Sequence, residues 1–241
     1  MSEHGESGMS LLRWAWEWTK VLATALLLFL FVRAFLVEAF QIPTGSMKST
    51  LLPGDFLLVN KAVYGAEIPG TGWHMPELAE PDVGDVVVFR PPPAAGQPSG
   101  ARYVKRVVGA PGDTVAMRDG TLWRNGRAIE EPYVERTPAW GERSSPRFGW
   151  QRRYLVGEAA ARKRYRPTRD DWGPVAVPAD SFFVMGDNRD NSEDSRYWGF
   201  VPRDAITGSP LFIYFSYDRD DRAARSWMPE VRWERLFEAV E

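Results

Sequence analysis

Hydrophobic and polar positions divide this chain into a long apolar segment near the N-terminus and a larger part in which short apolar runs alternate with turns. The first segment contains a predominantly apolar run at residues 21–32. The stretch around it, from Trp14 to Leu36, is long enough to span a bilayer, which takes about 20 residues. Tryptophan side chains before the run suit a membrane interface. Lys20 and Arg33 can extend towards the two head-group layers.

This segment fits either a retained transmembrane anchor or a signal peptide that is removed after export. Residues 37–39 satisfy the small-residue spacing of a cleavage site, but Arg33 interrupts the apolar run just before them. Three tryptophans also precede the run, which favours an anchor. We therefore expect an anchor over residues 14–37, preceded by a tail of residues 1–13. Basic residues flank both ends of the anchor, so they do not predict its orientation.

Beyond Phe40 the pattern is typical of a mostly β domain. Short apolar runs are bounded by Pro-Gly-Asp, Pro-Pro-Pro and similar turn sequences, which indicates buried strands. Asp119-Gly120 and Asn125-Gly126 mark tight turns and predict a meander. The expected strands are residues 56–59, 86–89, 103–107, 114–117, 121–124, 181–185 and 211–215. The pattern thus predicts a β-rich domain over residues 38–241, behind one N-terminal helix.

A polar stretch at about residues 130–174 interrupts the β pattern. It is rich in arginine and has no clean periodicity, so we interpret it as an inserted subdomain. Its arginines are expected to form a solvated face paired with acidic neighbours, and contact with anionic lipid is the weaker alternative. The tail at residues 231–240 fits either a short amphipathic helix or a last strand.

Composition excludes several kinds of function. The chain has 241 residues with 30 basic and 32 acidic side chains, and its net charge of −2 argues against nucleic acid as a partner. Because cysteine is absent, a thiol nucleophile, a disulfide framework and cysteinyl metal sites are excluded. The only histidines are His4 and His74, so a Ser-His-Asp triad or a zinc site has few candidates.

The turn at Thr44-Gly45-Ser46 offers a candidate nucleophile close behind the anchor. A serine hydroxyl needs a base. His4 would lie across the membrane from Ser46, and His74 sits in a Gly/Pro-rich loop without an orienting motif. The Ser46 amide and the Thr44 hydroxyl could both donate to an oxyanion. The alternative is an ordinary turn without a catalytic role, because these residue types favour turns.

Lys105 is the candidate base. A lysine can act so only if it is neutral near pH 7, and burial must therefore lower its ordinary pKa of about 10.4. If residues 103–107 form a strand, Lys105 shares an otherwise apolar face with Tyr103 and Val107, whereas Arg106 lies on the opposite face. The alternative is an edge-strand lysine that reaches water, because lysine is rarely buried.

The polar segment at residues 185–199 directly follows an expected strand. It does not fit an EF-hand, because Arg189 and Ser192 occupy positions that need a calcium ligand and a glycine. A hydrogen-bonded loop fits better: Asp194 can pair with Arg196, and Ser192 can hold the lysine amine.

Three motifs, at residues 41–53, 102–113 and 185–202, together resemble the bacterial type I signal peptidase (leader peptidase) family. The Gly-Asp-Asn-Arg-Asp-Asn-Ser sequence that begins at Gly186 is the most specific of them. The resemblance covers the anchor and most of the β core, but not residues 130–174. It implies a mostly antiparallel β catalytic domain, the signal-peptidase/LexA-like β fold, with an apolar surface that associates with the membrane.

The resemblance also implies roles for individual residues. Ser46 corresponds to the nucleophile and Lys105 to the general base, Thr44 to the oxyanion-hole hydroxyl, and Ser192 to the serine that orients the lysine. Positions that support the site are Arg106, Asp187, Asp194 and Arg196, and positions that line small-residue pockets are Ile42, Met47, Tyr103 and Val104. One departure is Ser49, where the family often has proline, and we expect a slightly looser turn there.

The function implied is that of a membrane-anchored Ser/Lys endopeptidase that removes signal peptides from exported preproteins after Ala-x-Ala-type sites. It needs no metal or cofactor. Its implied partners are preprotein signal peptides, membrane lipid and nearby export machinery. Its implied place is the bacterial plasma membrane, crossed once, with residues 1–13 in the cytoplasm and the catalytic domain outside.

Two other functions compete with this one. A non-catalytic anchored β domain in an envelope complex would explain the topology, but not the joint presence of Ser46, Lys105 and Ser192. A self-cleaving Ser/Lys repressor would need a DNA-binding element where this chain has the anchor.

Overall fold

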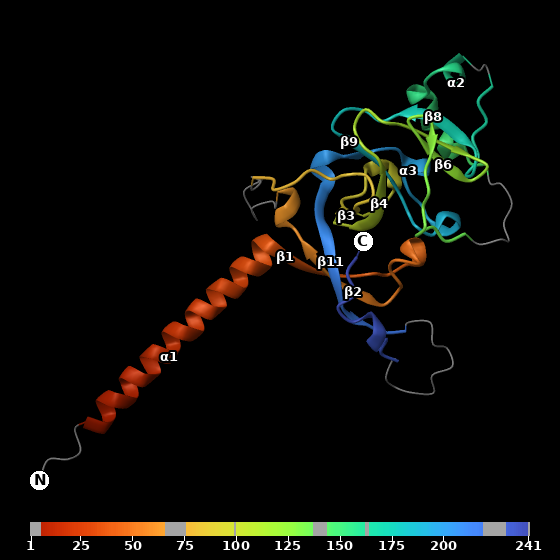
Figure 1. Cartoon of the computed structure of the whole chain (residues 1–241). Helices are drawn as coiled ribbons and strands as arrows, with labels where there is room; N and C mark the ends of the chain where they lie inside the picture. The colour runs from red at the N-terminus through yellow and green to blue at the C-terminus, as the bar shows by residue number, and fades with distance from the viewer. Residues whose placement is uncertain are drawn as a thin grey trace, which may run out of the picture.

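A computed structural model describes residues 6–65, 76–98, 100–136, 144–161, 164–218 and 230–240. His4 and His74 lie outside these ranges, as do parts of the expected tail and of the expected insert. The described residues form one long N-terminal helix followed by a β structure with short helices (Figure 1).

The N-terminal helix α1 spans Glu6–Phe31 and continues into a π-helical turn at Val32–Leu36. It begins earlier than the apolar pattern predicts, because the polar residues before Trp14 continue the same helix. Residues 11–31 are long and apolar enough to cross a membrane, and none of this stretch is buried against the other described residues. Figure 1 shows α1 extending away from the β structure. An apolar helix of this length fits a membrane anchor.

The larger sheet has seven strands in the order β1-β2-β11-β3-β4-β9-β10. The bounds of these strands are β1 Val37–Gln41, β2 Asp55–Asn60, β3 Val86–Phe89, β4 Tyr103–Gly109, β9 Ser181–Met185, β10 Val201–Pro202 and β11 Ile206–Ser216. All the neighbouring pairs are antiparallel.

A second, four-stranded antiparallel sheet has the order β7-β6-β5-β8. Its strands are β5 Thr114–Arg118, β6 Thr121–Arg124, β7 Arg127–Ala128 and β8 Trp172–Ala176. The remaining helices are short, among them α2 Glu158–Ala161, α3 Ser195–Trp198 and the 3-10 helix Pro146–Tyr154. The prediction of a mostly β, antiparallel fold is confirmed.

The centre of the seven-stranded sheet is buried on both faces. All four residues of β3 are buried: Val87 and Phe89 pack into one hydrophobic cluster with Val107, and Val86 and Val88 pack into another with Val104. This is why β3 is a continuous apolar run in the sequence rather than an alternating one. The neighbouring β4 is therefore enclosed over most of its length: Tyr103 is half-buried, and all the residues after it in the strand are buried.

The expected insert differs from the prediction in two respects. Strand β8 begins inside it, at Trp172, and pairs with β5. Arg169 is also not on a solvated face: it is buried and pairs with Asp170 and with Asp190 of the loop after β9. The described C-terminal tail is mainly irregular, with one short 3-10 turn at Trp233–Arg235 and single-residue bridges to β11 and Tyr217.

Candidate active site

Ser46 lies in a 3-10 turn, Gly45–Met47, that follows the extended chain after β1. Met47 is buried and fixes the turn on the hydrophobic cluster below it. On its other side, the loop after β9 holds the same turn, because the Asn188 amide donates to Ser46 O at 3.1 Å and Asn188 Nδ2 donates to Gly45 O at 3.1 Å. Ser46 is thus held between two parts of the chain that are far apart in sequence.

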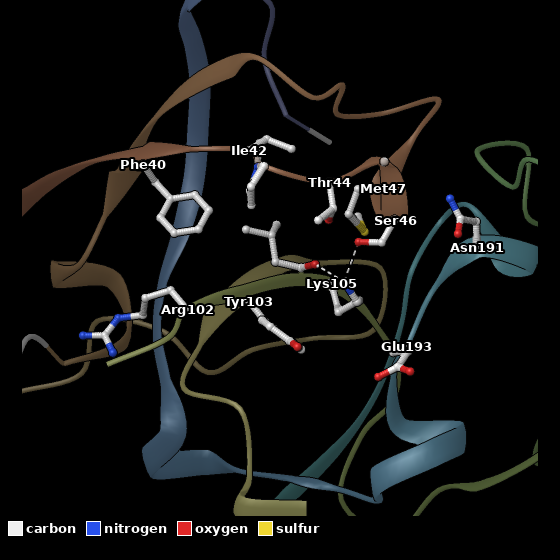
Figure 2. Close-up of a pocket in the computed structure, with 13 residues that line it drawn as sticks. Phe40, Ile42, Thr44, Ser46, Met47, Arg102, Tyr103, Lys105, Asn191 and Glu193 are labelled. Carbon is white, nitrogen blue, oxygen red and sulfur yellow. Dashed lines mark hydrogen bonds between the residues drawn. The ribbon is translucent and has the colours of Figure 1, made fainter. Parts of the chain in front are cut away.

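Lys105 lies on β4, between β3 and β9, and is only 4% exposed. The alternative of an edge-strand lysine is therefore wrong. Its Nζ donates to Ser46 Oγ at 2.7 Å and to Val104 O at 2.9 Å (Figure 2). Burial lowers the pKa of Lys105 from 10.5 to about 8, although the charges of Asp194 and Asp187 oppose the shift. A useful fraction of the amine is then neutral near pH 7 and can accept a proton.

A pocket of about 330 Å³ opens over Ser46 and Lys105. It is also lined by Thr44 and by the four residues expected in the substrate pockets, Ile42, Met47, Tyr103 and Val104. The pocket is further lined by Phe40, Arg102, Asn191 and Glu193, none of which was predicted from the sequence as a site residue. Phe40 directly precedes the first motif, Arg102 begins the second, and the other two lie within the third. Their positions in the sequence therefore pointed to the site, although their residue types did not.

Arg106 and Asp187 form a buried ion pair on the face of β4 opposite Lys105. Arg106 Nε donates to Asp187 Oδ1 at 3.0 Å and Nη2 donates to Oδ2 at 2.8 Å, with both side chains almost fully buried. Thr50, just after the Ser46 turn, donates to the same carboxylate at 2.6 Å. The pair thereby connects β4, the loop after β9 and the chain behind Ser46.

Asp194 and Arg196 form a second ion pair, as the sequence predicts, and neither side chain has any exposed surface. Arg196 Nε and Nη2 each donate to Asp194 at 2.8 Å, and the Gly186 amide donates to Asp194 Oδ2 at 3.1 Å. Burial raises the pKa of Asp194, but the charge and hydrogen bonds of Arg196 outweigh it and hold that pKa below its ordinary value. The pair therefore remains charged at neutral pH.

Gly186 lies close to both the Ser46 turn and Ser192. A Cβ at this position would overlap both Ser46 O and Ser192 Oγ, so only glycine fits. Ser192 is buried, but Lys105 Nζ bonds to Ser46 Oγ and Val104 O, and Ser192 Oγ has no direct hydrogen bond with that amine within the described residues. Its expected orienting role stays a prediction.

Ser49 has a backbone φ of 93°. Proline is confined to φ near about −65°, so this turn cannot be the one that a proline would make. The Ser49 hydroxyl donates to Tyr133 O and ties the turn to the beginning of the expected insert. The expected loosening is therefore offset by a hydrogen bond that proline could not make.

Within the described ranges, no group of three or more His, Cys, Asp or Glu side chains is placed to hold a metal ion. The site instead consists of a serine hydroxyl, a desolvated lysine amine and two buried ion pairs around an open pocket. A serine and a lysine so arranged define a class of hydrolase in which lysine replaces histidine as the base.

The sequence relationships are consistent with this class. Residues 15–215 match the family described as "Signal peptidase, peptidase S26". Signal peptidase I of Pseudomonas aeruginosa is 40% identical over 217 residues, which cover 83% of this chain and 72% of that protein. Signal peptidase I T of Bacillus subtilis is 36% identical over 203 residues, covering 84% of this chain and 86% of that protein. The chain belongs to the signal peptidase family, peptidase S26.

A solved structure of a signal peptidase I from Enterococcus faecalis is also similar. It is 28% identical in sequence, with a TM-score of 0.34, and the match covers 54% of this chain and 97% of that chain. Family membership follows from the sequence relationships and not from this overlap.

Proposed function

We propose that this chain is a membrane-anchored serine endopeptidase that removes signal peptides from exported preproteins, with Ser46 as nucleophile and Lys105 as general base. The observation that carries the proposal is the 2.7 Å hydrogen bond between Ser46 Oγ and a buried Lys105 amine whose pKa is lowered to about 8. Family membership supports the same reaction class.

In the proposed reaction Lys105 takes the Ser46 proton as Oγ attacks the carbonyl carbon of the scissile bond. The Ser46 amide and the Thr44 hydroxyl stabilise the resulting oxyanion. The tetrahedral intermediate then collapses, Lys105 protonates the departing α-amine, and the mature protein leaves an ester on Ser46. A water molecule, deprotonated by Lys105, hydrolyses this ester and releases the signal peptide.

The proposed substrate is a preprotein with small side chains at the third and first positions before the cut. Ile42, Met47, Tyr103 and Val104, which line the pocket beside Ser46, are proposed to form the sites for these side chains. Arg106 and Asp187 on one side of Lys105, and Asp194 and Arg196 on the other, are proposed to hold the base in place. Ser192 is proposed to orient the amine when Ser46 is acylated and no longer accepts its hydrogen bond.

We propose that residues 14–37 span the bacterial plasma membrane once, with residues 1–13 in the cytoplasm and the β domain of residues 38–241 outside, near the export machinery. The unburied apolar surface of α1 supports the anchor. In spheroplasts, external protease should digest the β domain and leave a small membrane-bound fragment. Protection of the β domain until the cells are lysed would contradict this orientation.

Ser46→Ala is expected to abolish cleavage of a preprotein with an Ala-x-Ala site by detergent-solubilised full-length protein. The reason is that the change removes the hydroxyl that is hydrogen-bonded to the proposed base, Lys105. Cleavage is followed by gel shift, and N-terminal sequencing of the product locates the cut. The control is Thr207→Ala, which removes a hydroxyl on β11 that donates to Val88 O. This variant should cut the substrate like the parent. If the parent leaves the substrate intact, a non-catalytic envelope adaptor becomes the better account.

A further inference from the structure

Glu193 and Arg147 form an ion pair at one end of the pocket. Arg147 Nη1 lies 2.8 Å from Glu193 Oε1, and Nη2 donates to Oε2 at 3.3 Å. Glu193 lines the pocket. Arg147 lies in the 3-10 helix Pro146–Tyr154 and reaches Glu193 from there. The two side chains keep 57% and 41% of their surface exposed, so the pair is open to exchange with an incoming charge.

The position of Glu193 relative to Ser46 suggests which part of a substrate it meets. In Figure 2, Phe40 and Arg102 lie on one side of Ser46 and Asn191 lies on the other, while Glu193 lies below Ser46, at the end of the pocket away from Phe40. Under the proposed function, the residues before the cut lie on the side of Phe40 and Ile42. A peptide that passes over Ser46 then continues towards Glu193 with the residues that follow the cut.

Both charges of the pair act inside the pocket. Burial raises the pKa of Tyr103, the negative charge of Glu193 raises it further, and the positive charge of Arg147 opposes the increase. Tyr103 lines the same pocket as Ser46. A substrate side chain in this space would therefore experience the charge of Glu193 and its partial neutralisation by Arg147.

We propose that Glu193 selects for a cationic side chain among the first residues after the scissile bond, and that Arg147 weakens this selection by neutralising Glu193. The inference rests on the proposed function. A substrate lysine or arginine can take the place of Arg147 because an exposed ion pair holds its partners only weakly. A substrate carboxylate in the same place meets Glu193 as a like charge, and such repulsion adds to specificity.

The test uses full-length protein in neutral detergent and preproteins that are identical except at one residue. Lysine, glutamine or glutamate is placed at each of the first three positions after the cut, and separately at the middle position of Ala-x-Ala before it. The measured quantity is the ratio of kcat/KM for the lysine substrate to kcat/KM for the glutamate substrate.

Glu193→Gln is expected to lower this ratio by about threefold at one or more positions after the cut. Arg147→Gln is expected to raise it by about threefold. Both effects are small because the charges are exposed to solvent. The ratio in the parent should approach one in roughly 1 M salt, because the Debye length is then only about 3 Å and the charges are screened. These opposite changes separate selection from a structural role, because loss of a merely structural pair would affect both substrates and both variants alike.

The matched control is Glu80→Gln, which removes the exposed partner of Arg203, 2.6 Å away, in an ion pair that does not line the pocket. It should leave the ratio unchanged. Equal ratios in the parent, Glu193→Gln and Arg147→Gln, with normal cutting of the glutamine substrate, would overturn the inference and leave the proposed function intact. An effect confined to the position before the cut would also overturn it. Failure to cut the glutamine substrate would instead count against the proposed function.

Discussion

Lys105→Met is expected to abolish peptide cleavage and, at pH 7, to make the β domain more stable. Removing the base should lower kcat by about 10⁴-fold, the upper range for a general base. Methionine has a similar length and adapts to irregular cores, so it can occupy the space of the lysine stem. The substitution also removes the positive charge of the Lys105 amine from apolar surroundings. The unfavourable burial of this charge is what lowers the pKa of Lys105 to about 8.

The pH dependence of this stability difference has a definite sign. Below pH 8 Lys105 is protonated in both the folded and the unfolded chain, so the folded chain bears the full desolvation penalty of the charge. Between pH 8 and 10.5 the folded chain loses this proton first, and the parent gains stability with rising pH, by about 3 kcal/mol in all. The advantage of Lys105→Met should therefore narrow across this window.

Thermal unfolding of full-length parent and variant in detergent, from pH 7 to 10.5, measures the difference. Ser46→Ala is the matched control, since it is inactive but keeps Lys105 and should follow the parent. The acid limb of the parent's kcat/KM should fall about tenfold per pH unit below the pKa of the base. A stability difference that does not change with pH would show that the amine is not desolvated.

The strands that sequence analysis predicted correctly are those whose signal is local. Residues 56–59 and 86–89 are apolar runs between turn sequences, and both are strands in the structure, the first alternating between buried and half-buried positions and the second buried throughout. Asp119-Gly120 closes the hairpin of β5 and β6, where both turn residues have positive φ. In each case the pattern and the turn lie within a few residues of each other, so no tertiary contact was needed to recognise the strand.

The features that were missed depend on contacts between distant parts of the chain. Strand β11 begins at Ile206 rather than at 211, and continues through Pro210, where a register shift against β2 accommodates the proline. Strand β8 includes Gly173-Pro174, which argues against a strand when only the sequence is considered. The burial of Arg169 likewise depends on Asp190, twenty-one positions away, and no periodicity encodes that distance.

Contacts expected within the candidate site are present because its motifs contain residues of complementary chemistry, while the roles of these residues stay predictions. Ser46 and Lys105 are 59 positions apart, yet their side chains meet at 2.7 Å. Asp194 and Arg196 form the ion pair expected for them. Glu193 could not be assigned from its residue type, since whether a loop carboxylate faces a pocket depends on how that loop packs.

Asp194→Asn and Arg196→Met are each expected to destabilise the β domain by about 3–5 kcal/mol, because either change leaves the other member of a buried ion pair without its partner. The double variant should lose less than the sum of the two, since it removes both charges together. Chemical denaturation of the full-length protein in detergent measures these changes. Glu131→Gln, which breaks the largely buried pair with Arg189, is a control with a comparable loss of stability.

The same two variants should move the activity profile in opposite directions, provided that enough folded protein remains. Asp194 raises the pKa of Lys105 and Arg196 lowers it. Asp194→Asn should therefore shift the acid limb of kcat/KM to lower pH, and Arg196→Met should shift it to higher pH, while Glu131→Gln leaves it in place. If both variants shift the limb in the same direction, or neither shifts it, the ion pair only holds the loop together. Opposite shifts would mean that this buried pair, besides fixing the loop after β9, sets the protonation of the base.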